Sequence, residues 1–442
     1  MTLQELKSIE KAFDVPLSEM KRIIRAFHSE MGKGLSDSDG SLKMIPTYVD
    51  RPTGDEKGKF IALDLGGTNF RILEMELKGG KNISKPVSRQ FVLDRKYLAG
   101  DGKALFDFIA GCVEIFLKGK GIDKAAHFDL GFTFSFPVEQ TGIASGRLLR
   151  WTKGFNAKGV IGKDVVRLLD EALAGKHVNN VKVAALANDT VGTMVARAYE
   201  DPDCDVGVIL GTGTNACYRE YISNIKKLHS GMTYAGQMIV NTEWGNFNKL
   251  RTNSYDKILD EGSGNRGSQI LEKMVSGMYL GEIFRLIAKD LMKKKVLFAG
   301  TNIGVFGKRG CFKTEYMSAI ESDHSAGLPD MARLFKKLGI KDTTLRDRQL
   351  CRNICRIVSG RASRISAAAL AAVIMKMDRE LSRKHTIAID GSVFEKYPGF
   401  SDRMRSALKE IFGNRSSRVS MVLAKDGSGK GAAIIAAVAG SL

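Results

Sequence analysis

Two short glycine-rich segments, each placed directly after an apolar run, carry residues suited to holding phosphate. They are Gly66-Gly67-Thr68-Asn69 and Gly211-Thr212-Gly213-Thr214-Asn215. Glycine lets the backbone come close to a ligand, and successive backbone N–H groups then form an anion-binding concavity. Asp64, just before the first segment, is suited to a hydrated magnesium ion, which usually takes only one or two carboxylates. One such turn is equally typical of an ordinary hairpin, but two related turns favour a nucleotide site.

A third segment supports this interpretation. The apolar run Thr386–Ile389 ends in Asp390-Gly391-Ser392, and small residues at strand ends are where α/β folds bind nucleotides. The run Gly427-Ser428-Gly429-Lys430-Gly431 lacks the spacing of a Walker A motif, and no dinucleotide-binding fingerprint is present. The sequence therefore predicts a nucleotide site of another kind.

A second set of polar residues stands at strand ends and turns, where it could bind the hydroxyl groups of a sugar. A site that hydrogen-bonds hydroxyls rejects analogues lacking one by roughly 10⁴ to 10⁵, because its own polar groups are left unpaired. Each member also has a structural explanation, such as a helix N-cap for Asn188, a surface turn for Thr152, or a buried hydrogen-bonded carboxylate for Glu243. The set comprises Ser135, Thr152, Lys153, Asn188, Asp189, Asn215 and Glu243.

Asp189 is the member of this set best suited to act as a general base. It closely follows the apolar run Val181–Ala187, so we expect its carboxylate to be partly desolvated. A positioned base contributes about 10² to 10⁴ in rate. Phosphoryl transfer depends otherwise on positioning and on neutralisation of charge.

The elements that position these residues alternate between strands and helices, with helical insertions, which predicts an α/β protein. Each glycine turn lies between two predicted strands, and the turns stand about one domain apart, which favours an internal duplication with a cleft between its halves. Further strands are predicted at 128–136 and 181–187. Helices are predicted at 3–31 with a break at Pro16, and at 103–118, 163–174, 268–295 and 345–382, with shorter ones within 314–338.

Composition limits the class of protein. The 442 residues, 43% of them hydrophobic, suit two or three domains. The net charge of +19 favours either solubility or a polyanionic partner, but no nucleic-acid-binding signature accompanies it. The six scattered cysteines are typical of reduced thiols. The amino terminus lacks the apolar run of a signal peptide and Ala432–Ala439 is too short to span a bilayer, so we expect a cytoplasmic protein without a membrane anchor.

Taken together, the motifs resemble the hexokinase and glucokinase family, as a single unit. The likeness extends in order from about residue 5 to the carboxyl end. The matching segments are Leu63 to Arg71, Leu130 to Pro137, Trp151 to Phe155, Leu186 to Gly192, Gly211 to Tyr218, Asn241 to Gly245, Ser276 to Glu282, Asp390 to Ser392 and Gly427 to Ala432.

The resemblance implies a two-lobed, actin-like ATPase fold in which each lobe is built on a ribonuclease-H-like mixed sheet. Residues 54–188 plus 428–442 would form the small domain, and residues 1–53 plus 189–427 the large one. ATP and sugar would bind in the cleft between them, and the lobes would close over the sugar. The implied activity is Mg²⁺-dependent transfer of phosphate from ATP to the 6-hydroxyl of glucose, mannose or fructose, the first step of glycolysis, by a monomer or homodimer.

The resemblance also assigns roles to residues. Asp189 would be the general base, and Lys153 would neutralise charge near the transferred group. Asp64 would hold Mg²⁺ through water, beside the phosphates. The sugar would be held by Ser135, Thr152, Lys153, Asn188, Asp189, Asn215, Glu243, Gln269 and Glu272. The nucleotide would be held by Asp64, Gly66, Gly67, Thr68, Asn69, Arg71, Thr212, Gly391 and Ser392.

Three other classes stay open at this point. They are a sugar sensor on the same scaffold, a chaperone-like or cytoskeletal ATPase of the same fold class, and a protein that binds nucleic acid or membranes through its positive charge. A sensor has no need of the base, so the presence of Asp189 and Lys153 favours the kinase. The chain also departs from the family pattern at 246–249 and at 264–268, in the loops that precede Gln269 and Glu272.

Overall fold

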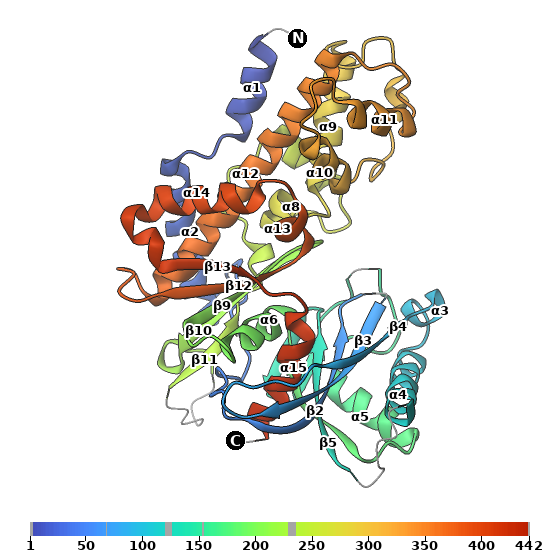
Figure 1. Cartoon of the computed structure of the whole chain (residues 1–442), viewed down its shortest axis with the longest axis vertical. Coiled ribbons are helices and arrows are strands. Elements are labelled where there is room, and N and C mark those ends of the chain that lie inside the picture. Colours follow the sequence, from blue (N-terminus) through green and yellow to red (C-terminus); the bar gives the residue numbers. More distant parts are fainter. Residues whose placement is uncertain (1–2, 68, 120–125, 153, 229–235, 441–442) are drawn as a thin grey trace.

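Two lobes, each built on its own β-sheet, make up the molecule (Figure 1). The computed structural model describes residues 3–67, 69–119, 126–152, 154–228 and 236–440. The small lobe is defined by the five-stranded sheet, and the large lobe by the six-stranded sheet with the helical insertions that follow it. The domain limits expected from the sequence stay a prediction.

The small-lobe sheet combines an antiparallel meander with two parallel strands. Its order is β4-β3-β2-β5-β8, with β2, β5 and β8 parallel. Alternate side chains of β2 serve two cores: Ile61 and Leu63 face helices α4 and α5, whereas Ala62 faces the opposite side. The elements are β2 (Lys57–Leu65), β3 (Asn69–Lys78), β4 (Val87–Val92), α3 (Arg95–Leu98), α4 (Gly102–Gly119), β5 (Phe128–Phe134), β6 (Val138–Gly142), β7 (Ser145–Leu148), α5 (Val165–Gly175) and β8 (Val181–Ala187).

The large-lobe sheet repeats the same plan. Strands β9, β10 and β11 form an antiparallel meander, and β12 and β13 continue it in parallel with β9, in the order β1-β11-β10-β9-β12-β13. The strand pairs β2–β3 and β9–β10, which flank the two glycine turns, thus hold equivalent places in the two sheets. The strands are β1 (Ile45–Pro46), β9 (Cys204–Leu210), β10 (Thr214–Tyr221), β11 (Gln237–Asn241), β12 (His385–Asp390) and β13 (Val419–Leu423).

Helices cover the large-lobe sheet and build a helical subregion at its far end (Figure 1). They include two helices before the first sheet, α1 (Leu3–Phe13) and α2 (Leu17–Leu35), separated at Pro16 as predicted. The others are α7 (Ser254–Glu261), α8 (Ile270–Val275), α9 (Leu280–Lys293), α10 (Thr314–Ser322), α11 (Pro329–Lys337), α12 (Leu345–Met377), α13 (Ser392–Lys396) and α14 (Phe400–Phe412), with 3₁₀ turns η1 (Ile222–Asn224), η2 (Trp244–Asn246), η3 (Ile303–Phe306) and η4 (Gly413–Arg418).

The single long helix predicted at 268–295 is wrong, because the chain breaks into α8 and α9. Ser276 leaves the helical region with φ −86° and ψ 156°. The backbone N–H groups of Gly277 and Met278 then donate to the carbonyls of Gly211 and Thr212 at 2.8 and 3.1 Å. The second glycine turn therefore takes up the hydrogen bonds that would have continued the helix.

Two helices, α6 (Asp189–Ala198) and α15 (Gly427–Ala439), lie between the sheets and join the lobes (Figure 1). They cross at glycines, since a Cβ added to Gly431 would stand 1.9 Å from the carbonyl oxygen of Gly192. Around this crossing lies a third core, to which both sheets contribute side chains. Contact this close requires glycine.

Helix α12 is the central helix of the large lobe. It begins at a capping box formed by Thr344 and Asp347, and its 33 residues are long and apolar enough to cross a membrane by length and composition. However, 83% of its most apolar window is buried inside the protein, as in the core helix of a globular fold. All six cysteines belong to the described residues as free thiols, five of them buried, two of these in α12.

Candidate functional site

The first glycine turn joins β2 to β3, and Asp64 stands at the end of β2 beside it. The Asp64 carboxylate accepts a hydrogen bond of 2.7 Å from the Ser428 hydroxyl and lies 3.5 Å from the Arg71 guanidinium. Arg71 also pairs with Asp426 at 2.8 Å. A cavity of about 350 Å³ opens here, lined by Asp64, Gly66, Asn69, Phe70, Arg71, Gln90 and Asp426. Thr68 lies outside the described residues.

The second glycine turn joins β9 to β10 and packs against the end of β12. Gly391 has φ +121°, and a Cβ there would lie 2.4 Å from the carbonyl of Leu210, so only glycine fits. Gly211 in turn lies close to Gly391, with 3.3 Å between its hypothetical Cβ and the Gly391 Cα. Thr212 and Ser392 are exposed beside this contact. Two of the three predicted nucleotide segments therefore meet at one edge of the large-lobe sheet.

Three residues predicted to hold the sugar form one hydrogen-bonded cluster where the end of β8 meets the large-lobe sheet. The amide of Asn215 donates from Nδ2 to the Oδ1 of Asn188 at 3.3 Å and to the Oε1 of Glu243 at 3.1 Å. Asn241 completes the cluster, accepting from Asn215 at 2.8 Å and donating to Glu243 at 2.9 Å. Amide and carboxylate groups arranged in this way can both donate to and accept from the hydroxyls of one ligand.

Glu272 and Gln269 lie against the same loops. The Glu272 carboxylate accepts from the backbone N–H of Thr214 at 3.1 Å, and the Gln269 side-chain oxygen would stand 2.4 Å from a Cβ on Gly245. Gln269 and Glu243 both adopt left-handed backbone conformations, with φ 56° and 51°. Such conformations cost free energy in residues other than glycine and are concentrated at functional sites. The unusual loop 264–268 therefore still brings Glu272 to the second glycine turn and Gln269 to Gly245, beside Glu243.

Asn188 and Asp189 stand where β8 ends and α6 begins. Asn188 is the N-cap, as one interpretation of the sequence had it, because its Oδ1 accepts from the Thr190 N–H at 3.0 Å. The same oxygen accepts from Asn215, so capping and membership of the cluster are compatible. Asp189, the first residue of the helix, is half-buried.

Four carboxylates gather around the place where the lobes meet. Burial raises the pKa of Asp390, and the negative charges of Asp189, Asp426 and Asp64 raise that pKa further, against a hydrogen bond from the Gly391 N–H. The four groups come from β2, α6, β12 and the segment before α15. Carboxylates whose negative charges act on one another favour the arrival of a cation.

These carboxylates are compatible with magnesium of the kind that accompanies a nucleotide. Among the described residues, no group of three or more His, Cys, Asp or Glu side chains is arranged to bind a metal ion by itself. Magnesium prefers oxygen ligands, keeps several waters and is usually bound by one or two carboxylates plus substrate phosphates. Asp64 with the Ser428 hydroxyl offers such oxygen ligands.

Two further predicted sugar residues, Ser135 and Thr152, belong to the small lobe. Ser135 is buried, with its Oγ 3.6 Å from the place of a Cβ on Gly66, and so borders the first glycine turn. Thr152 is half-buried, and its carbonyl accepts from the Phe155 N–H at 3.0 Å. Within the described part of the chain, neither side chain is hydrogen-bonded to the cluster of Asn188, Asn215, Asn241 and Glu243. Lys153 lies outside the described residues.

Sequence reasoning missed four residues that the structure places in these contacts. Asn241 was overlooked although it stands two residues before Glu243 in the same motif. Ser428 was noted only as part of a glycine-rich run and Asp390 only as part of a strand end, and Asp426, which precedes that run, was not singled out. Asp426 and Ser428 have partners more than 350 residues away in the sequence, so the spacing of residues gave no signal for these contacts.

The structure thus defines a two-lobed α/β protein with phosphate-type turns and a polar cluster between its lobes. A family model described as Hexokinase matches residues 5–199, and a second model with the same description matches residues 205–438. Human hexokinase-1 is 42% identical over 436 residues, 96% of this chain, and rice (Oryza sativa subsp. japonica) hexokinase-7 is 40% identical over 450 residues, 98% of this chain and 96% of its own length. This chain spans about half of human hexokinase-1, at 46% of its length.

Solved structures agree with these matches. The Schistosoma mansoni hexokinase complexed with glucose superposes with a TM-score of 0.89 at 37% identity, covering 98% of both chains. Another hexokinase crystal structure gives a TM-score of 0.83 at 32% identity, again over 98% of both chains. The chain belongs to the hexokinase family. The predicted two-lobed α/β fold of the actin-like ATPase kind is confirmed.

Proposed function

We propose that the protein phosphorylates glucose and related hexoses at the 6-hydroxyl, with Mg·ATP as phosphate donor. The observation that carries the proposal is the hydrogen-bonded cluster of Asn188, Asn215 and Glu243, which directly adjoins Asp189 in the chain. The glucose complex of the Schistosoma mansoni relative supports the choice of sugar. In this proposal the reaction is the first step of glycolysis in the cytoplasm, carried out by a monomer or homodimer.

In the proposed mechanism the cluster of Asn188, Asn215 and Glu243 binds the sugar hydroxyls and orients the 6-hydroxyl toward Asp189. The Asp189 carboxylate takes the proton of the 6-hydroxyl group. At the same time the oxygen of that hydroxyl bonds to the γ-phosphorus of ATP, and the bond between the γ-phosphorus and the oxygen that bridges to the β-phosphate breaks. Lys153 and Arg71 balance the negative charge of the phosphates. Magnesium, when bound near Asp64, would neutralise charge on the phosphate oxygens.

Closure of the lobes would complete the site. Ser135 and Thr152 belong to the small lobe and are not hydrogen-bonded to the cluster of Asn188, Asn215 and Glu243, so in this proposal closure brings them to the bound sugar. Closure also excludes water, which would otherwise accept the phosphate. The glycine crossing of α6 and α15 joins the lobes at this place, and closure would pivot about it.

The proposal is tested by measuring ADP release from Mg·ATP with glucose, mannose or fructose. We expect release that depends on sugar, with the rank of the three sugars showing the preferred hexose. ADP release that is insensitive to sugar would instead indicate an ATPase of the same fold. Calorimetric sugar binding by folded protein without any ADP release would indicate a sensor.

A further inference from the structure

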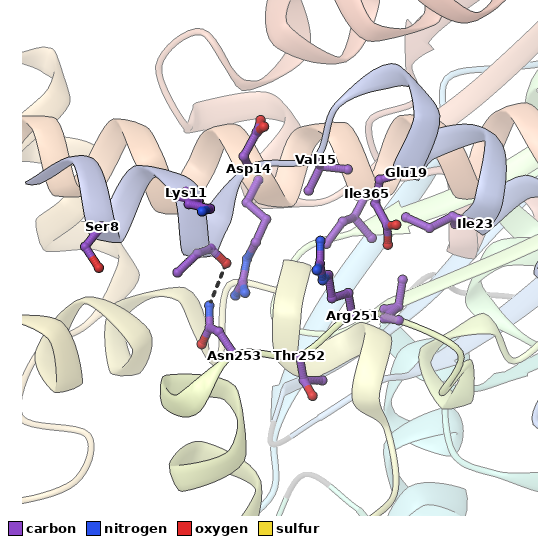
Figure 2. A pocket seen from close by; sticks show the side chains of 13 residues that line it. Ser8, Lys11, Asp14, Val15, Glu19, Ile23, Arg251, Thr252, Asn253 and Ile365 are labelled. Atoms are coloured by element: carbon purple, nitrogen blue, oxygen red, sulfur yellow. Dashed lines mark hydrogen bonds between the residues drawn. The ribbon is translucent and has the colours of Figure 1, made fainter.

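A second cavity, of about 340 Å³, lies on the large lobe among segments that carry none of the predicted site residues. Helix α1, the start of α2, the loop before α7 and the middle of α12 surround it (Figure 2). Its volume falls in the range of small-molecule sites.

Basic groups without partners distinguish this cavity. Lys11 and Arg251 are exposed at its rim, and among the described residues neither has an ion-pair or hydrogen-bond partner. Figure 2 shows Arg251 rising from its loop toward the segment that contains Val15. Arg361 also lines the cavity, and its Nε is buried without an acceptor in the described part of the chain. An unsatisfied buried donor is costly, so a ligand acceptor there would be favoured.

The acidic groups around the cavity are mostly neutralised. Glu19 is bound by the Arg22 guanidinium at 2.7 and 2.9 Å. The other two nitrogens of Arg361 are bound by Asp256 at 2.7 and 2.8 Å. The Asp14 carboxylate points away from Lys11 and Arg251 in Figure 2, and its charge acts on Arg364 of α12. Lys11 and Arg251 therefore leave the cavity with unneutralised positive charge, which favours an anion.

The cavity also has an apolar wall, formed by Val15, Ile23 and Ile365. The Phe13 ring covers the face of the Arg361 guanidinium at 4.2 Å, which leaves the edge of that group for an acceptor. An anion with a short carbon skeleton can contact this wall while its charged end meets the basic groups. This favours an organic acid over a bare inorganic anion.

Helix α7 connects the cavity with the predicted sugar site. At its beginning, Asn253 donates to the carbonyl of Ala12 at 3.2 Å, and Asp256 is bound to Arg361. At its end, Asp260 accepts from Lys273 of α8 at 2.6 Å and from the N–H of Gly267 at 3.0 Å. Glu272 and Gln269 therefore belong to a loop and helix that α7 holds in place.

We propose that this cavity binds a small organic acid through its carboxylate, and that occupancy changes the affinity of the chain for sugar. The second half of the proposal rests on the proposed function, because it assumes that Gln269 and Glu272 serve a sugar. Binding of the acid is measured independently of turnover, so a failure of either proposal can be recognised separately.

The test uses succinate and inorganic phosphate as probes, with calorimetry on the full chain. We expect succinate to bind more tightly than phosphate, and the charge reversals Lys11→Glu and Arg251→Glu to weaken succinate binding by at least about tenfold. Lys7→Glu on α1 and Lys257→Glu on α7 are matched controls, since both residues are exposed and do not line the cavity. We expect these controls to bind succinate like the parent chain.

Saturating succinate should change the glucose dissociation constant by about fivefold or more, in the range typical of coupled sites. Succinate binding that survives Arg251→Glu, or phosphate binding as tight as that of succinate, would overturn the site. A glucose affinity that is unchanged by bound succinate would overturn the coupling. If the parent chain binds succinate but does not bind glucose, the proposed function is wrong and the anion site stands.

Discussion

Asn215 and Glu243 are joined by a hydrogen bond of 3.1 Å between the Asn215 Nδ2 and the Glu243 Oε1. The bond joins the start of β10 to the turn after β11, and it holds the side chains of two predicted sugar residues next to each other. Asn241 is bonded to both of them, at 2.8 and 2.9 Å, and is buried. Asn241 is therefore a positioning residue that orients the other two.

Replacing Asn241 with alanine should lower kcat/KM for glucose by about tenfold or more, because Glu243 loses a donor and Asn215 an acceptor. Steady-state kinetics measure this effect, and a double-mutant cycle with Glu243→Gln shows whether it acts through Glu243. We expect strong non-additivity. Additive effects of the two substitutions would show that Asn241 has only a general structural role.

Asp189→Ala should retain glucose binding while kcat falls by about 10² to 10⁴, the contribution of a positioned base. Calorimetry measures the binding, and the ADP-release assay measures kcat. Asp203→Ala, in the turn after α6, serves as a control of the same residue type. Turnover that is unchanged in Asp189→Ala would show that another group takes the proton.

Arg71→Lys should raise KM for Mg·ATP by about tenfold and leave glucose binding unchanged. Lysine keeps the charge but cannot bind Asp64 and Asp426 with a planar fork. Arg89→Lys on the neighbouring strand β4 is the control. Arg89 is exposed, lies opposite Ile72, the residue after Arg71, and does not line the cavity beside Asp64. A change in glucose affinity of similar size would contradict a role for Arg71 toward the nucleotide.

Gly431→Ala should destabilise the chain by about 1–3 kcal/mol, because a methyl group would enter the crossing with α6, 1.9 Å from the Gly192 oxygen. Gly111→Ala is the matched helical control, since no atom outside its own helix lies within 4 Å of the added Cβ. That substitution should stabilise by up to about 1 kcal/mol. Urea unfolding compares the two, and equal effects would show that the crossing tolerates a side chain.

Asp390→Asn should raise the melting temperature near neutral pH. The folded pKa of Asp390 is raised by burial and by the charges of Asp189, Asp426 and Asp64, so its ionised form opposes folding. This penalty is present above the folded pKa and disappears as the pH falls below the ordinary aspartate pKa of about 3.9.

The gain from Asp390→Asn should therefore shrink on acidification, and thermal unfolding across a pH series measures it. Asparagine can still accept the hydrogen bond from the Gly391 N–H. Asp402→Asn, at an exposed surface pair with Arg405, is the control. A gain that is the same at acidic and at neutral pH would contradict the electrostatic origin.

Local pattern determined much of this molecule. The strands on either side of each glycine turn, the N-cap at Asn188 and the break at Pro16 depend on residues adjacent in the chain, so the sequence alone predicted them. Strands β4 and β13 were not predicted. Most of β4 is exposed, and β13 is only partly buried, so neither has the alternation of apolar and polar residues by which a strand is identified.

Only the tertiary structure decided which of the predicted residues meet. Arg71 and Asp426 are 355 residues apart, and Asn215 and Asn241 are 26 apart. The first contact is set by how the two sheets pack around α6 and α15, and the second by the antiparallel pairing of β10 with β11, not by spacing along the chain. The sequence by itself determined which side chains could do the chemistry and on which turns they stand. The packing of the lobes determined that Asn241, Asp390, Asp426 and Ser428 stand beside them.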